Sequence, residues 1–437
     1  MKRRLFRNSF PILAIAGLLS TSGFAQGVIN TVAGTGTYGT TGDGGSARSA
    51  NIAAPQGVAV NRSGDMYIVY GSTLRKVSGT TGVISSISIS STVISAANVW
   101  VDESDNVYIT DRFHDQVFKV AGSSISVHCG NGHQGRTGDG GDCHDGTFMI
   151  PAASCVDGMG NTYIADYGSN EIRKVNTSGI LSRVAGTGTS GFSGDGGSAV
   201  LAKISAPSGV ACDHDGNVYF TDKGNHRIRK IDIATGNIST ICGTGTAGFS
   251  GDGSAAVSAQ IKSPTGISID LAGNIFFCDN GNNRIRKINV DGIITTIAGT
   301  GIAGYSGDGG SPLAAKISNP TGVWVDESAS VYIADASNNR IRKISFSPTG
   351  PKASLGENET NRLTVSPNPS SGLVTLTVSE DMLNQPVQVV ALDGRVVYSS
   401  TIVSLNQEIS LDQPAGIYMI EVLGTSGKTT QKLVLNK

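Results

Sequence analysis

Short segments in which apolar and polar residues alternate recur along most of this chain, and Gly, Asn and Asp separate them. Because the alternation has a period of two, it predicts β-strands rather than helices. From Gly179 to Ile344 the same pattern returns three times at a spacing of about 56 residues, which is typical of a repeat architecture. A unit of that size built from short strands is expected to be a propeller blade.

The strand pattern predicts six blades. Three strands recur in the ranges 55–77, 96–120, 151–175, 207–231, 264–288 and 320–344, and an outer strand follows the first five of them. Residues 28–33 match residues 293–298 closely, so the N-terminal segment is expected to supply the outer strand of the last blade. Such closure limits exposed strand edges. The chain is therefore predicted to be all-β, with a six-bladed β-propeller over residues 27–346.

The first 26 residues differ from the rest. Basic residues precede an apolar run from Phe10 to Leu19, and small residues follow it. This order predicts a Sec signal peptide over residues 1–26. A membrane anchor is the alternative, but the run is shorter than the ~20 residues that a spanning helix requires. With a net charge of -1 and 15% charged residues, the chain has no electrostatic preference for nucleic acid or anionic membranes.

A second domain is predicted at the C-terminal end. Ser, Pro and Gly after Phe346 indicate a linker over residues 347–361. Alternating strands return over residues 362–437 and predict a small domain similar to a β-sandwich.

Two resemblances follow from the residues themselves. Segments such as Pro264 to Ile267 and Asp279 to Lys287 resemble the NHL repeats of six-bladed propellers, although Tyr70 replaces the Asp that ends the second strand elsewhere. The C-terminal domain is similar to the type A sorting domain of the Bacteroidetes type IX secretion system. The motif residues are Pro367, Asn368, Pro369, Gly394, Gly416 and Tyr418. This resemblance implies the type IX machinery as a partner and a secreted or cell-surface protein; a small adhesion domain is the alternative.

Five of the connections between blades contain Gly-Asp-Gly. The aspartates are Asp43, Asp139, Asp195, Asp252 and Asp308. Each loop is expected on the top face, where its carboxylate either bonds its own backbone or contacts a ligand. One carboxylate per loop falls short of the six to eight oxygens that calcium prefers, unless carbonyls supply the others. These aspartates are therefore candidate ligand-binding residues. The aspartates that end the second strands, by contrast, are expected to tie down tight turns.

Residues that occur once are better candidates for function than repeated ones. The third interblade loop holds His128, His133 and His144, which could bind zinc, together with Cys129 and Cys143. For an exported protein, a Cys129–Cys143 disulfide that braces the loop is the favoured explanation, and bound zinc and free thiols are the alternatives. Trp100 and Trp324 share one inner-strand position, where they either stack on a sugar or fill the core.

The sequence favours a binding or scaffold module with a protein or glycan ligand. A metal-dependent enzyme similar to propeller lactonases, lyases or amidating lyases is the alternative, with its site on the top-face loops. No catalytic residue is assigned, because no catalytic arrangement can be recognised. No cofactor is predicted, and calcium or zinc remains an open alternative.

Overall fold

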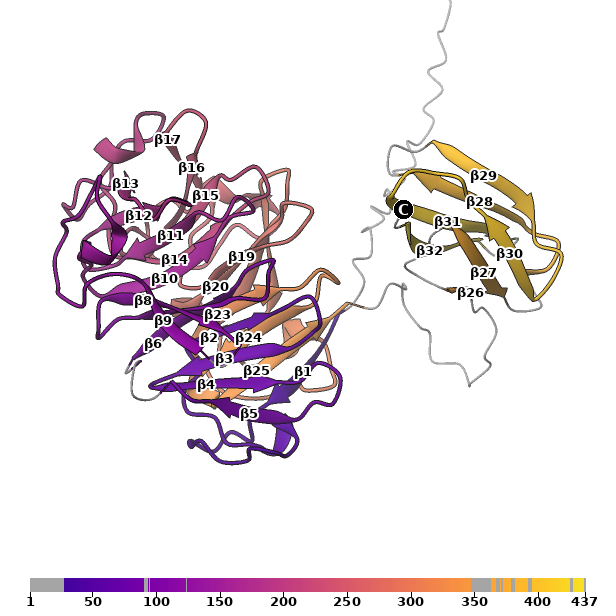
Figure 1. Ribbon diagram of the computed structural model, residues 1–437, viewed down its shortest axis with the longest axis horizontal. Coiled ribbons are helices and arrows are strands. Elements are labelled where there is room, and N and C mark those ends of the chain that lie inside the picture. Colours follow the sequence, from indigo (N-terminus) through magenta and orange to yellow (C-terminus); the bar gives the residue numbers. More distant parts are fainter. Residues whose placement is uncertain are drawn as a thin grey trace, which may run out of the picture. The chain divides into compact units, whose positions relative to one another are not determined.

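The computed structural model describes residues 27–89, 93, 95–122, 124–346, 363–366, 370, 372–378, 382–391, 395–424 and 427–435. The chain divides into two compact units, Met1–Pro351 and Lys352–Lys437, which we describe separately (Figure 1). The predicted signal peptide and linker lie outside the described residues. The domain bounds given above therefore stay a prediction.

The first unit contains one sheet for each predicted blade. Blade 1 consists of β2 (Gly57–Val60), β3 (Met66–Tyr70), β4 (Thr73–Val77) and β5 (Ile84–Ile87). Blade 2 consists of β6 (Ala96–Val101), β7 (Val107–Asp111), β8 (Gln116–Ala121) and β9 (Ser124–Cys129). Blade 3 consists of β10 (Pro151–Val156), β11 (Thr162–Asp166), β12 (Glu171–Val175) and β13 (Leu181–Ala185).

The other three blades repeat this order. Blade 4 consists of β14 (Pro207–Cys212), β15 (Val218–Asp222), β16 (Arg227–Asp232) and β17 (Asn237–Cys242). Blade 5 consists of β19 (Ile267–Ile269), β20 (Ile275–Asp279), β21 (Arg284–Ile288) and β22 (Ile293–Ala298), with β18 (Ser254–Ala255) paired to β22. Blade 6 consists of β23 (Pro320–Val325), β24 (Val331–Asp335), β25 (Arg340–Ser345) and β1 (Val28–Ala33).

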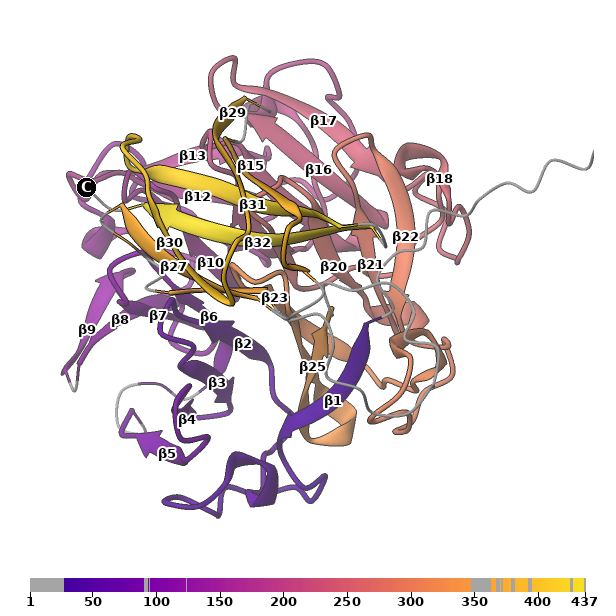
Figure 2. The ribbon, with the colours of Figure 1, turned by 90° about the vertical axis from the view of Figure 1, so that its right-hand side faces the viewer.

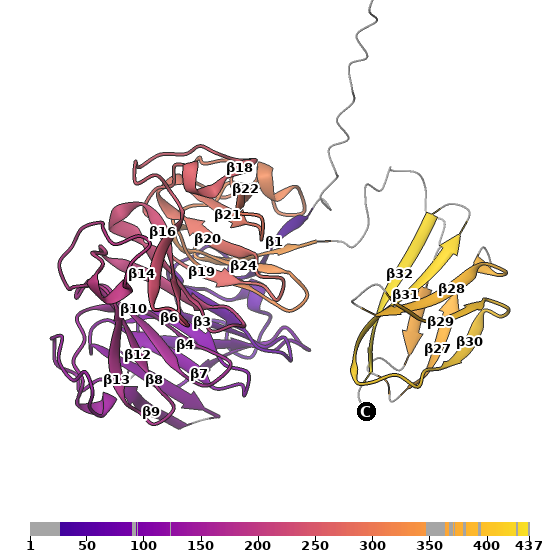
Figure 3. The same ribbon diagram turned by 90° about the horizontal axis from the view of Figure 1, so that it is seen from above.

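The N-terminal strand closes the ring. β1 pairs antiparallel with β25, and Ile29 lies opposite Ile344 (Figure 2). The inner strands contact one another in the cyclic order β2, β6, β10, β14, β19 and β23, and β23 returns to β2. Six sheets thus form a closed propeller in the described part of residues 27–346, and their strands run outward from its axis (Figure 2); Figure 3 shows the same sheets from another side. This arrangement confirms the predicted strand triplets and the closing role of residues 28–33.

The core lies between adjacent blades. All five residues of β11, β20 and β24 are buried, because each of these second strands has a neighbouring blade on both faces. One apolar cluster joins Ile29 to Phe276 and Val323, and so links blades 5 and 6. Burial of such side chains is the main contribution to the stability of the ring.

Single-turn 3-10 helices occur at two repeated places. Five end the glycine-rich loops: η1 (Ala47–Ser49), η2 (Cys143–Asp145), η3 (Ala199–Leu201), η5 (Ala256–Ser258) and η7 (Pro312–Ala314). Three connect the second and third strands: η4 (Lys223–Asn225), η6 (Asn280–Asn282) and η8 (Ala336–Asn338). At Gly299, which begins one loop with φ of 97°, an added Cβ would meet the carbonyl oxygen of Asn283. Glycine is therefore required where this loop crosses the turn.

The second unit has two sheets around one apolar core. One sheet has the order β26 (Leu363–Ser366), β27 (Leu373–Val378) and β30 (Asn406–Ser410). The other has the order β29 (Val396–Thr401), β28 (Pro386–Ala391), β31 (Gly416–Gly424) and β32 (Gly427–Leu435). Val374, Val389 and Ile420 are buried together in the shared core. No helix among the residues that the structure describes is long and apolar enough to span a membrane.

Two of the predicted sorting-motif residues can be placed. Gly416 begins β31 and lies opposite Leu435, and the Tyr418 hydroxyl donates a 3.0 Å hydrogen bond to the carbonyl oxygen of Pro414. Pro367, Asn368, Pro369 and Gly394 lie outside the described residues.

Candidate functional site

Each of the five Gly-Asp-Gly carboxylates forms an ion pair with a fully buried arginine. The arginine comes from the third strand of the blade that follows the loop. The pairs are Asp43–Arg75 at 2.6 Å and Asp139–Arg173, Asp195–Arg229, Asp252–Arg286 and Asp308–Arg342 at 2.7 Å. The loop is thereby fastened to the blade beside it, and a ligand-binding role for these aspartates stays a prediction.

Three of these arginines, Arg229, Arg286 and Arg342, also face the aspartate that ends the second strand of their blade. Arg229 Nη1 lies 3.5 Å from Asp222 Oδ2, and Arg342 Nη1 lies 3.6 Å from Asp335 Oδ2. Both aspartates are fully buried, and each accepts a hydrogen bond from a backbone amide of the preceding loop. Burial raises the pKa of each to about 6, although these hydrogen bonds and the arginine charge oppose the shift. The aspartates therefore hold the turns in place.

Blade 2 lacks this arrangement. Phe118, which lies opposite Ile109, takes the ladder position that Arg229 takes opposite Phe220 in blade 4. The connection before blade 2 has no Gly-Asp-Gly segment. Asp111 instead contacts the ring of His114, with 2.8 Å between Oδ2 and Nδ1. Blade 2 thus lacks the buried arginine, and the connection before it lacks the aspartate that would pair with that arginine.

Two of the three candidate zinc histidines make separate side-chain contacts. His128 Nε2 lies 2.8 Å from Thr162 Oγ1, whereas His144 Nδ1 lies 2.8 Å from Asp142 Oδ1. Burial, with the charges of Lys119 and His144, lowers the pKa of His128 to about 4. The one group of close ligand atoms found among the described residues is Asp142, Cys143 and His144, which includes neither His128 nor His133. The predicted histidine trio is therefore not brought together.

The predicted Cys129–Cys143 disulfide is not formed, and both residues are free thiols. The Cys129 thiol donates to the carbonyl oxygen of Cys143, and the Cys143 thiol donates to the carbonyl oxygen of His128, each at 3.2 Å. These backbone contacts satisfy the two thiols without a covalent bond. A different pair, Cys155 and Cys212 of adjacent inner strands, has its sulfur atoms 3.0 Å apart.

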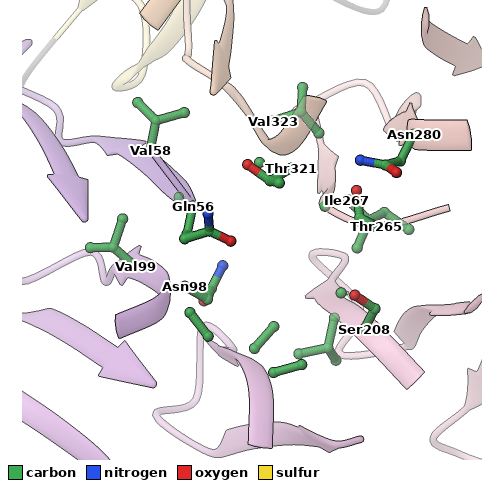
Figure 4. A pocket seen from close by; sticks show the side chains of 18 of the residues that line it. Gln56, Val58, Asn98, Val99, Ser208, Thr265, Ile267, Asn280, Thr321 and Val323 are labelled. Atoms are coloured by element: carbon green, nitrogen blue, oxygen red, sulfur yellow. The ribbon is translucent and has the colours of Figure 1, made fainter. Parts of the chain in front are cut away.

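The inner strands surround a cavity of about 250 Å³ at the propeller axis. Figure 4 shows Gln56, Asn98, Ser208, Thr265 and Thr321 around one central space. These side chains come from different blades. Each lies at or near the start of an inner strand, where the chain passes the propeller axis. The cavity is therefore lined by amide and hydroxyl side chains together with glycine, alanine, valine and isoleucine residues.

The two tryptophans meet beside this cavity. The Trp100 and Trp324 rings lie edge to face, with centroids 4.9 Å apart, although blade 1 separates their blades. Trp100 packs against the cluster that contains Ile267, and Trp324 packs against the cluster that contains Ala59. Both rings are half-buried and line the cavity. They are therefore placed both to pack against core residues and to contact a ligand.

The remaining wall of the cavity carries two cations that sequence reasoning missed. Arg112 and Lys223 each follow the aspartate that ends a second strand, in blades 2 and 4, and both line the cavity with Asn280 of blade 5. The same position is Gly71, Tyr167 and Ala336 in the other blades. This variation within an otherwise regular repeat is the signal that could have found them.

Comparison with known proteins agrees with this architecture. Residues 29–110, 188–248 and 242–305 match the family described as Teneurin NHL domain, and residues 364–436 match the family described as Secretion system C-terminal sorting domain. The chain carries NHL repeats and a C-terminal sorting domain. The sorting domain indicates export by the type IX secretion system to the cell surface or the extracellular space. This export agrees with the predicted signal peptide.

Relatives of the NHL propeller are much longer proteins. Teneurin-1 of Homo sapiens is 25% identical over 362 residues, which cover 73% of this chain and 13% of that protein. Protein SUPPRESSOR OF QUENCHING 1, chloroplastic, of Arabidopsis thaliana is 34% identical over 199 residues, which cover 43% of this chain and 18% of that protein. The chain thus spans less than a fifth of either relative.

Solved structures share the propeller fold. A protein of unknown function from Bacteroides thetaiotaomicron has a TM-score of 0.58 at 20% identity, and the match covers 73% of this chain and 76% of that one. An auxiliary nutrient binding protein from Bacteroides ovatus has a TM-score of 0.56 at 18% identity, covering 74% and 77%. Likeness at these identities shows the fold alone.

Proposed function

We propose that the NHL propeller is an exported binding module that takes the end of a glycan chain into its axial cavity. One observation carries this proposal: amide and hydroxyl groups from several blades converge on a cavity that two tryptophan rings also line. Sugars are recognised by this combination, because aromatic rings cover their C–H faces and amides bond their hydroxyls.

Several of the polar groups have hydrogen-bonding capacity left over. Gln56 donates its amide to the carbonyl oxygen of Ala54, which leaves its side-chain oxygen to accept. Asn98 uses its oxygen to accept from the Ser154 amide, which leaves its side-chain NH₂ group to donate. Within the described part of the chain, the Ser208 hydroxyl makes no hydrogen bond. A ligand with several hydroxyls can use all three groups.

The size of the cavity limits what can enter. Its volume of about 250 Å³ is below the roughly 300–1,000 Å³ typical of sites for drug-sized ligands. One sugar residue is therefore a better match than a run of residues along a chain. A protein ligand would have to insert a single side chain or a terminus.

The metal-dependent enzyme has no comparable support. Among the described residues that line the cavity there is no Asp, Glu, His or Cys side chain. Such groups are the usual acids, bases and metal ligands of hydrolases and lyases.

The test is binding of the full chain to a panel of oligosaccharides and peptides, followed by calorimetric titration of the hits. Asn98→Ala is expected to weaken glycan binding by about threefold to tenfold, the usual contribution of one hydrogen bond. Asn237→Ala serves as the matched control, because Asn237 is exposed on the outer strand β17. Binding of peptides only, or equal effects of the two substitutions, would contradict the proposal.

A further inference from the structure

The axial cavity has an uneven distribution of charge. Arg112 and Lys223 stand at its mouth on blades 2 and 4, and Tyr167 of blade 3 stands between them in the repeat. The Lys223 ammonium lies 5.8 Å from the centre of the Tyr167 ring, so that ring supports its position. One side of the mouth is therefore cationic.

No carboxylate lines the cavity beside these two cations. In the described ranges neither Arg112 nor Lys223 forms an ion pair, and the lining contains no acidic side chain. The nearest aspartates along the chain, Asp111 and Asp222, are fully buried and are directed to His114 and Arg229 instead. The two cations are thus available to a ligand.

The pKa values of both cations are lowered, although the Arg112 residue is exposed and Lys223 is half-buried. Burial lowers the pKa of Arg112, although Tyr167 and Asp111 oppose the shift. Burial also lowers the pKa of Lys223, and the positive charge of Arg112 lowers it further. Since like charges repel, an anion that contacts both cations would offset their repulsion.

The repeat itself indicates that these cations are not needed for the fold. Blades 1, 3, 5 and 6 have Gly71, Tyr167, Asn280 and Ala336 at the same position, and their strands pair in the same order. A cation is therefore not required by the turn between the second and third strands.

We infer that the cavity recognises an anionic sugar residue, whose carboxylate or sulfate group is bound by Arg112 and Lys223. The inference rests on the proposed glycan function and adds the chemical class of the terminal residue. Arg112 can bond an oxyanion through two N–H groups, while Lys223 adds a point charge. The amides and hydroxyls of the other blades then contact the sugar ring.

The experiment is calorimetric titration of the full chain with three probes of equal length. These are an oligogalacturonate, its methyl ester and a sulfated neutral oligosaccharide. We expect at least one charged probe to bind about tenfold or more tightly than the ester at low salt, with the preference falling as salt rises. A preference for the carboxylate or for the sulfate identifies the source of the anion.

The double variant Arg112→Gln/Lys223→Gln is expected to lose the preference for charged probes over the ester. Lys203→Gln is the control, because Lys203 is exposed on an interblade loop and does not line the cavity. Circular dichroism and thermal melting establish that each variant is folded.

The outcomes separate the two proposals. Equal affinity of the parent protein for charged and neutral probes would overturn the anion inference and leave the glycan function standing. A charge preference that survives in the double variant would also overturn the inference. Binding to none of the probes would contradict both.

Discussion

Blade 2 and the other five blades bury different residues at the same ladder position. Five blades place an arginine there, and each arginine forms an ion pair with the aspartate of a glycine-rich loop. Blade 2 places Phe118 there, and its preceding connection has no such loop. The fold thus accommodates either a buried arginine paired with a loop aspartate or a buried phenylalanine without such a loop at this position.

The comparison separates the repeated charges from the unique ones. The loop aspartates and buried arginines recur because each pair fastens a glycine-rich loop to the blade that follows it. Arg112 and Lys223 occur once each at their position, and neither takes part in this network. We therefore assign the repeated charges to stability and the unique charges to binding.

The largest effect is expected from Arg286→Ala in blade 5. Removal of this arginine leaves Asp279 buried without its charged partner and Asp252 without its ion pair. Loss of one partner of a buried pair typically costs about 3–5 kcal/mol. Urea unfolding measures the change. Lys287→Gln on the same strand should stay within about 0.5 kcal/mol, and an equal loss there would undermine the comparison.

A smaller effect is expected from Asp252→Ala, since its carboxylate is 38% exposed and Asp279 remains beside the arginine. The double variant Asp252→Ala/Arg286→Ala should cost less than the sum of the single changes. A difference of about 0.5–3 kcal/mol is typical of residues in contact. Strict additivity in urea unfolding would mean that the ion pair is not a coupled unit.

Lowering the pH should change the stability contributions of two buried groups, one in blade 2 and one in blade 6, in opposite directions. His128 of blade 2 has its pKa lowered to about 4 by burial, so its contribution to stability is present above pH 6.5 and is lost as the pH falls toward 4. Asp335 of blade 6 has its pKa raised to about 6 by burial, so its contribution is present below pH 3.8 and is lost as the pH rises through 6.

As the pH falls from 6 to 4, His128 is expected to lower the unfolding free energy of the parent protein, and His128→Gln should remove this loss. Over the same range Asp335 is expected to raise the unfolding free energy, and Asp335→Asn should remove this gain. The measurement is the difference in unfolding free energy between each variant and the parent protein at those two pH values. Differences of the same sign would contradict the assigned burial of one of the two groups.

The smallest effect on stability is expected from Arg112→Gln/Lys223→Gln. Neither cation forms an ion pair in the described chain, and the positive charges of Arg112 and Lys223 repel each other. The unfolding free energy should therefore change by no more than about 0.5 kcal/mol, or rise slightly. Thermal unfolding measures it. A clear destabilisation would show that these charges also belong to the fold.

The propeller was predictable because alternation and repetition are local signals. Strand triplets recur at a nearly constant spacing, and the match of residues 28–33 to an outer strand correctly placed β1 beside β25. The partners of the loop aspartates were missed, since a fully buried arginine is rare. A signal was present: Asp195 and Asp252 each precede their arginine by 34 residues, and blade 2 lacks both partners.

The candidate site was less predictable, because it is assembled from side chains of different blades. Sequence reasoning singled out Trp100 and Trp324 but could not show that their rings meet across blade 1. It favoured the loop of His128, Cys129 and Cys143, where the structure shows hydrogen bonds to Thr162 and to backbone carbonyls. Crowding along the sequence did not bring His128, His133 and His144 together into one group of close ligand atoms.

The central claim is that repeated charges support the fold and unique charges support binding. Its most direct test is the unfolding free energy of Arg286→Ala and of Arg112→Gln, measured side by side in urea. Our account predicts a loss of about 3–5 kcal/mol for the first and a change within about 0.5 kcal/mol for the second. Similar losses for the two variants would contradict it.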